Sequence, residues 1–96
     1  MMRYIDKSKD FKKDMKRIER SGSYRQNVKS RLAAALIALA NDGVLDYSYH
    51  DHELHGDKEG YRKCHILFDL VLMYRYEGDD FLILERLGSH SEVLGL

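Results

Sequence analysis

The change in the spacing of apolar residues along the chain most constrains its fold. Between Phe11 and Leu39, apolar side chains recur at intervals of three and four residues, the spacing of helices with one buried face. From Tyr61 onward the interval falls to two residues, the spacing of strands with one buried face. Helices followed by strands in one chain define the α+β class, which we therefore predict.

Two helices are expected in the first half. The first begins after Ser8, a residue type that caps helices, and carries the apolar stripe Phe11, Met15 and Ile18. The second covers residues 24–40 and is largely buried, because residues 32–40 are apolar on nearly all sides. Only residues 21–23 separate them, and this short connection predicts a helical hairpin.

The strands are expected at residues 2–6, 61–68, 70–76 and 81–87, with a loop over residues 44–59. The strand 61–68 places Cys64, Ile66 and Phe68 on one face and His65 on the other. The strongly apolar strand 70–76 is expected at the centre of the sheet. The predicted order is βααβββ, a helical hairpin packed on a small antiparallel sheet, in one domain spanning residues 1–96.

The formal net charge of zero hides two oppositely charged halves. Residues 1–31 hold 11 Lys and Arg against 4 Asp and Glu, whereas residues 32–96 hold 5 against 12. The basic half is suited to lie along a nucleic-acid backbone, and the alternative is a solvated helix surface. The single cysteine, Cys64, excludes an intrachain disulfide and a cysteine-built zinc site. A cytoplasmic protein is expected, because the N-terminus is not a signal peptide and no apolar run approaches a membrane span.

Titratable residues stand where the predicted strands end. Asp69 opens a strand, His65 precedes it by four residues across a turn, and Arg86 and His90 bracket a Gly-Ser turn after the last strand. Cleavage of a phosphodiester by acid–base chemistry needs a base, an acid and a cation that stabilises the phosphorane. Imidazole, carboxylate and guanidinium groups at one end of a sheet supply this set.

Four segments in order resemble the YafQ branch of the RelE toxin superfamily across about residues 46–94. They are Asp51-His52-Glu53-Leu54-His55-Gly56, Gly60-Tyr61-Arg62-Lys63-Cys64-His65-Ile66, Asp69-Leu70-Val71-Leu72-Met73-Tyr74 and Leu84-Glu85-Arg86-Leu87-Gly88-Ser89-His90-Ser91-Glu92. The resemblance implies a metal-independent endoribonuclease without a cofactor that cleaves mRNA in the ribosomal A site. The 2′-hydroxyl of the RNA would attack the adjacent phosphorus and leave a 2′,3′-cyclic phosphate and a 5′-hydroxyl. The implied partners are an antitoxin protein, the ribosome and mRNA, with operator DNA bound only through the antitoxin complex and no membrane.

The family's catalytic positions fall here on His52, His65, Asp69, Arg86 and His90. His90 is the expected general acid, because an imidazole gives or takes a proton near neutral pH. Asp69 is the candidate base, directly or by orienting a histidine, and partial desolvation at the strand start would raise its pKa; the alternative is a turn aspartate. Arg86 is the candidate phosphate clamp, or a strand arginine paired with Glu85 or another acid.

The remaining candidates have weaker support. His65 would orient the substrate or share proton transfer with Asp69, and His52 would contact the phosphate, assist proton transfer or shape the loop. The candidate RNA-binding residues are Lys9, Lys12, Lys13, Lys16, Arg17, Arg20 and Lys63. The loop histidines are not expected to bind metal, because their spacing is loose.

Three residues depart from the best-known family member. Lys63, Leu70 and Leu94 stand where that protein has aspartate, tryptophan and phenylalanine. The two lost aromatic rings remove surfaces on which bases stack. Two other functions remain open: a same-fold toxin that poisons gyrase, as ParE relatives do, and a degenerate toxin that acts only in a repressor complex with its antitoxin.

Overall fold

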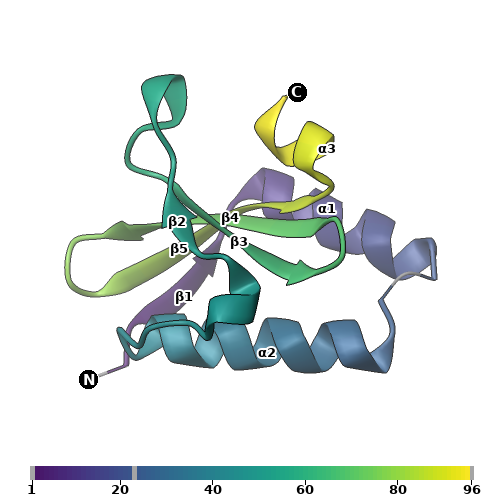
Figure 1. The fold of residues 1–96 in the computed structure, drawn as a ribbon, viewed down its shortest axis with the longest axis horizontal. Helices are drawn as coiled ribbons and strands as arrows, with labels where there is room; N and C mark the ends of the chain where they lie inside the picture. The colour runs from purple at the N-terminus through teal and green to yellow at the C-terminus, as the bar shows by residue number, and fades with distance from the viewer. Residues whose placement is uncertain (1, 23, 96) are drawn as a thin grey trace.

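The computed structural model describes residues 2–22 and 24–95 and shows two long helices against one face of a five-stranded sheet (Figure 1). The elements are β1 (Tyr4–Lys7), α1 (Lys9–Arg20), α2 (Gln26–Ala40), the short 3₁₀ helix η1 (Tyr47–Tyr49), β2 (His52–Glu53), the 3₁₀ helix η2 (Gly56–Lys58), β3 (Arg62–Leu67), β4 (Leu70–Glu77), β5 (Phe81–Gly88) and α3 (His90–Leu94). The strand order is β1-β5-β4-β3-β2. Within the described ranges, none of these helices has the length and apolar character needed to cross a bilayer.

The predicted α+β class is confirmed, and β4 is the central strand as expected. Three features differ from the prediction. The region 44–59 contains β2, and α3 follows β5, because elements this short have no measurable apolar period. The sheet is mixed, since β1 pairs in parallel with β5. That pairing joins the two ends of the chain, and no local turn signal announces it.

The main core lies between the helices and the sheet. Phe11 and Ile18 of α1 and Leu32 and Leu39 of α2 pack with one face of the three long strands, which contributes Cys64, Ile66, Leu72, Tyr74, Leu82, Leu84 and Leu87. Burial raises the pKa of the Cys64 thiol to about 12, as expected for a core residue. On the opposite face, Val71 and Met73 form a smaller cluster with Val93 of α3. In Figure 1, α2 lies below the sheet and α3 above it.

The prediction that Phe68 shares a strand face with Cys64 and Ile66 is wrong. Phe68 is 88% exposed and occupies the turn between β3 and β4 with a φ of +51°. The register of this hairpin shifts between His65 and Leu67, so the strand alternation ends before residue 68. The left-handed backbone then turns the ring out of the sheet.

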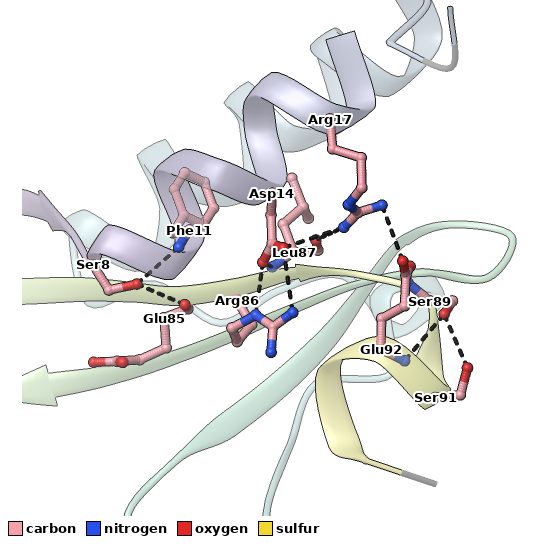
Figure 2. Close-up of polar contacts among 10 residues, drawn as sticks. All are labelled: Ser8, Phe11, Asp14, Arg17, Glu85, Arg86, Leu87, Ser89, Ser91 and Glu92. Carbon is pink, nitrogen blue, oxygen red and sulfur yellow. Dashed lines mark hydrogen bonds and ion pairs between the residues drawn. The ribbon is translucent and has the colours of Figure 1, made fainter. Parts of the chain in front are cut away.

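Side chains of α1 replace a strand along part of the β5 edge (Figure 2). β1 pairs with β5 only as far as Leu84, which leaves the edge beyond it open. Ser8, the cap of α1, donates from Oγ to the Glu85 carbonyl oxygen at 2.7 Å. Asp14 accepts the Leu87 backbone N–H on Oδ2 at 2.9 Å. The helix therefore covers backbone groups that a short β1 leaves without a strand partner.

Asp14 is a buried carboxylate with a full set of donors. Besides Leu87, its oxygens accept from Arg86 Nε at 2.8 Å and Arg17 Nη2 at 3.2 Å. Burial raises the pKa of Asp14, but the hydrogen bonds from Arg86, Leu87 and Arg17 outweigh it and hold the pKa below its ordinary value. Asp14 is therefore charged and joins α1 to the end of β5.

Replacing Asp14 by Asn tests this joint. The amide cannot accept from both arginines, so we expect the free energy of unfolding at pH 7 to fall by about 1.5–3 kcal/mol. Because the pKa of Asp14 is lower in the folded state, its contribution is present above pH ~4 and disappears as the pH falls through the folded pKa. Urea unfolding from pH 2 to 7 should therefore show a weaker acid dependence in D14N.

The matched control is Asp10→Asn, which removes an exposed charge from the first turn of the same helix. A D10N protein that loses as much stability as D14N would contradict the role given to Asp14.

Candidate active site

The sheet register places three of the five candidate catalytic residues, His52, His65 and Arg86, on the face away from α1 and α2. His52 pairs with Lys63, Lys63 with Met73, and Met73 with Arg86. Residues paired directly across strands project from the same face, so these four form one row across the sheet. His65 pairs with Val71 in the next row, on the same face, in agreement with the predicted alternation around Cys64 and Ile66.

His90 is positioned by the first turn of α3. Ser89 caps this helix, and a reciprocal pair of hydrogen bonds joins Ser89 to Glu92: Ser89 N donates to Oε1 at 2.9 Å and Glu92 N to Ser89 Oγ at 3.2 Å. Arg17 of α1 then holds Glu92 through an ion pair of 3.1 Å (Figure 2). His90, the first helical residue, is thereby tied to α1 through Glu92 and Arg17.

Asp69, His90 and His65 form a continuous chain of contacts. Asp69 Oδ1 accepts the His90 backbone N–H at 3.1 Å and lies 2.5 Å from His90 Nδ1. His90 Nε2 lies 3.2 Å from His65 Nε2. His50 extends the chain, with its ring centre 5.5 Å from that of His65. The turn between β3 and β4, the strand β3 and the start of α3 thus meet at one point.

Asp69 is an ionised carboxylate in its contact with His90. The hydrogen bonds from the His90 side chain and backbone hold its pKa below the ordinary value, and the side chain is 67% exposed. The expectation that desolvation at a strand start would raise this pKa is therefore wrong. Asp69 lies in the turn between β3 and β4, and its Oδ1 contacts both the backbone N–H and the ring of His90.

His65 is held as a neutral imidazole near neutral pH. Partial burial lowers its pKa, and the charges of His90, Lys63, His50 and His52 lower it further. Because the Asp69 carboxylate can only accept, His90 Nδ1 carries the proton in their contact. The contact between the two Nε2 atoms then requires one shared proton, which is an arrangement suited to proton transfer.

Arg86 does not join this chain. Its guanidinium pairs with Asp14 through Nε at 2.8 Å and Nη2 at 3.3 Å, so the structure matches the ion-pair alternative with an acid other than Glu85. Glu85 instead accepts from Arg75 at 2.9 Å. The Arg86 side chain is 30% exposed. Its Nε and Nη2 donate to Asp14, and Nη1 is not part of this ion pair.

The remaining candidate residues lie on β2, β3 and α1. His52 is exposed on the edge strand β2, and Lys63 shares its row on β3. The α1 residues Lys9, Lys12, Lys13, Lys16 and Arg20 are exposed. Arg17 differs from them because it is paired with both Asp14 and Glu92.

Sequence reasoning missed three residues that shape this region, namely Asp14, His50 and Arg31. Asp14 carried a signal, since it stands on the apolar stripe of α1 between Phe11 and Ile18. His50 was considered only as a loop histidine. Across the described ranges 2–22 and 24–95, no three or more His, Cys, Asp or Glu side chains are grouped to hold a metal ion.

The mixed sheet, the two helices on one face and the Asp–His–His chain of contacts on the other define a small α+β protein with a candidate acid–base site. Residues 3–95 match the family model described as a bacterial toxin of type II toxin–antitoxin system, YafQ. This chain therefore belongs to the YafQ family of toxins from type II toxin–antitoxin systems.

Individual relatives agree with this assignment. The chain is 36% identical over 91 residues to the putative toxin YafQ of Haemophilus influenzae, covering 92% of this chain and 88% of that protein. It is 34% identical over 88 residues to the mRNA interferase toxin YafQ of Escherichia coli K12, covering 81% and 95%. The crystal structure of the E. coli DinJ–YafQ toxin–antitoxin complex matches with a TM-score of 0.80 at 33% identity, covering 99% and 100%.

The charges around His65 predict how it titrates. In NMR titrations, we expect its midpoint to lie below the ordinary value of about 6.5. His90→Gln should move the midpoint upward, because it removes the largest of the neighbouring charges, but not fully, because burial remains. Lys63→Gln should move it upward as well. Lys7→Gln on β1 is the control, and an equal shift there would show that the effect is not local.

Proposed function

We propose that this protein is a ribosome-dependent endoribonuclease that cleaves mRNA in the A site through attack by the RNA 2′-hydroxyl. The observation that carries this proposal is the contact chain from Asp69 through His90 to His65 on the open side of the sheet. The names of the E. coli relatives, mRNA interferase toxin YafQ, support it. No metal or other cofactor takes part in the proposed reaction.

In the proposed mechanism the two imidazoles divide the proton transfers. His65, neutral because its pKa is lowered, accepts the proton of the 2′-hydroxyl. The 2′-oxygen attacks the adjacent phosphorus, the bond from phosphorus to the 5′-oxygen breaks, and His90 Nε2 gives that oxygen its proton. Asp69 holds His90 through Nδ1, so that Nε2 faces the substrate. The products are a 2′,3′-cyclic phosphate and a 5′-hydroxyl.

Cations along the sheet would bind the RNA backbone. His52 and Arg86 lie at the two ends of one row, three strand spacings apart, or roughly 14 Å. That span is too wide for their backbones to flank a single phosphate, so the row serves a stretch of RNA. Arg86 would reach the phosphorane with Nη1 while Asp14 holds its other nitrogens, and Lys63 would bind a neighbouring phosphate.

The cellular partners follow from the same proposal. The exposed lysines of α1, with Arg20, would approach ribosomal RNA, whose phosphates attract a basic surface. A cognate antitoxin would bind and silence the protein in the cytoplasm, as the E. coli DinJ–YafQ complex suggests, and operator DNA would be bound only through that complex.

Substitution of His90 and Asp69 by Ala tests the chemistry. Each proton-transfer group contributes about 10²- to 10⁴-fold, so H90A should lose at least 10²-fold in cleavage of ribosome-bound mRNA. D69A should lose activity because His90 is no longer oriented. The assay maps the 5′ ends of the products, and His55→Ala, in the exposed loop, is the control. Parent-like growth inhibition by both variants would exclude the catalytic mechanism, and DNA damage with intact mRNA would favour the gyrase-poisoning alternative.

The phosphate clamp is tested at Arg86. Arg86→Gln removes a donor to the phosphorane and should reduce cleavage by about 10²-fold. Arg86→Lys should recover only part of this, because an ammonium group cannot hold Asp14 and a phosphate in the same fork geometry. Arg75→Gln is the matched control, since Arg75 is a strand arginine paired with a carboxylate outside the site. Cleavage that falls equally in both Gln variants would assign Arg86 a structural role.

A further inference from the structure

Phe68 is an aromatic residue that the fold leaves exposed beside the candidate active site. Its side chain is 88% exposed, and its φ of +51° is a conformation that bulky residues rarely adopt. It directly precedes Asp69 in the turn between β3 and β4. Strained residues of this kind persist where the surrounding structure holds them, and they gather at functional sites.

A cavity of about 350 Å³ connects Phe68 to the catalytic chain. Its lining residues are Arg31, Ser48, His50, His65, Leu67 and Phe68. His65 belongs both to this cavity and to the contact with His90, so a group bound in the cavity lies next to the reacting phosphate. The lining combines a cation, two imidazoles and an exposed ring.

Contacts with Ile66 and Tyr49 hold the Arg31 side chain in this cavity. Its Nε donates to the Ile66 carbonyl oxygen on the part of the β3 edge beyond β2. Its guanidinium carbon lies 4.0 Å from the centre of the Tyr49 ring, and Tyr49 in turn donates its hydroxyl to the Arg31 carbonyl oxygen at 3.0 Å. The guanidinium is therefore held in place before any ligand binds.

The charge of Arg31 is not neutralised directly. Among residues 2–22 and 24–95, no carboxylate forms an ion pair with it. Within the described residues, the Nη atoms form hydrogen bonds only with the Ser48 hydroxyl, at the long distances of 3.4 and 3.5 Å, and Ser48 donates to Asp46 at 2.7 Å. A fixed guanidinium with weakly engaged amino groups is suited to bind a phosphate.

We propose that Phe68 and Arg31 form a binding site for the nucleotide next to the scissile phosphate, with the base stacked on Phe68 and the phosphate bound by Arg31. This inference rests on the function proposed above. It gives the chain an aromatic surface for a base beside the candidate active site, where Leu70 and Leu94 offer none. An exposed ring stacks on any base, and a guanidinium binds the backbone, so the site holds single-stranded RNA without a strict sequence requirement.

Substitutions of Phe68 test the stacking without disturbing the core. Phe68→Asn removes the ring and tolerates the left-handed backbone, whereas Phe68→Trp keeps an aromatic surface. Removal of one stacked base contact corresponds to a weakening of about 5- to 150-fold. In ribosome-bound cleavage with the full chain, F68N should raise KM by this factor and change kcat little, and F68W should stay within a few fold of the parent. Tyr4→Ala, an exposed aromatic on β1, is the control and should keep the parental KM.

Arg31 is tested with a charge-matched pair. Arg31→Gln should raise KM, whereas Lys7→Gln, which removes a charge on β1, should not. Thermal unfolding accompanies both, because Arg31 also holds Ile66. If R31Q does not fold, F68N alone decides the proposal.

The outcomes separate this inference from the proposed function. A parent protein that does not cleave mRNA on ribosomes overturns both. A parent that cleaves, together with an F68N protein of unchanged KM, overturns the nucleotide site alone. Unchanged KM with weaker antitoxin binding by F68N would assign the exposed ring to a protein partner, which also overturns the site.

Discussion

The buried carboxylate of Asp14 is the interaction on which the arrangement of the site depends. It replaces a strand partner for Leu87, holds the guanidinium of Arg86 and contacts Arg17, which continues to Glu92 and the cap of α3. One charged group on α1 is thereby linked to Arg86, the candidate clamp, and through two ion pairs to the helix that carries His90. A charge is tolerated in this buried position because Leu87, Arg86 and Arg17 donate hydrogen bonds to it.

Side chains from the helical layer cover both edges of the sheet, where the outer strands β1 and β2 are too short to pair with the whole of β5 and β3. Ser8 and Asp14 of α1 bind the β5 edge, and Arg31 of α2 binds the β3 edge at Ile66. Exposed strand edges invite pairing with other chains, and polar side chains remove that hazard. A guanidinium takes part at both edges, because Arg86 pairs with Asp14 and Arg31 itself donates to the Ile66 carbonyl oxygen.

The site itself could be predicted in part. Proton-transfer residues at strand ends and the four family-like segments led to His65, Asp69 and His90, which the fold brings into contact. The expected rise in the pKa of Asp69 is wrong, because the turn leaves its side chain exposed and His90 donates to it. The pairing of Arg86 with Asp14 joins residues 72 positions apart, and no local pattern encodes such a contact. The exposure of Phe68 depends on a shift of register that alternation alone does not reveal.

The sequence by itself determined the α+β class, the two long helices, the three long strands and the open-face position of His65, because periodicity and turn residues act over short distances. Only the tertiary structure decided the parallel pairing of β1 with β5 and the neighbours of His90, Arg86, Arg31 and Phe68. These features arise from contacts between residues far apart in the chain, and which groups meet there depends on how the layers pack rather than on any local preference.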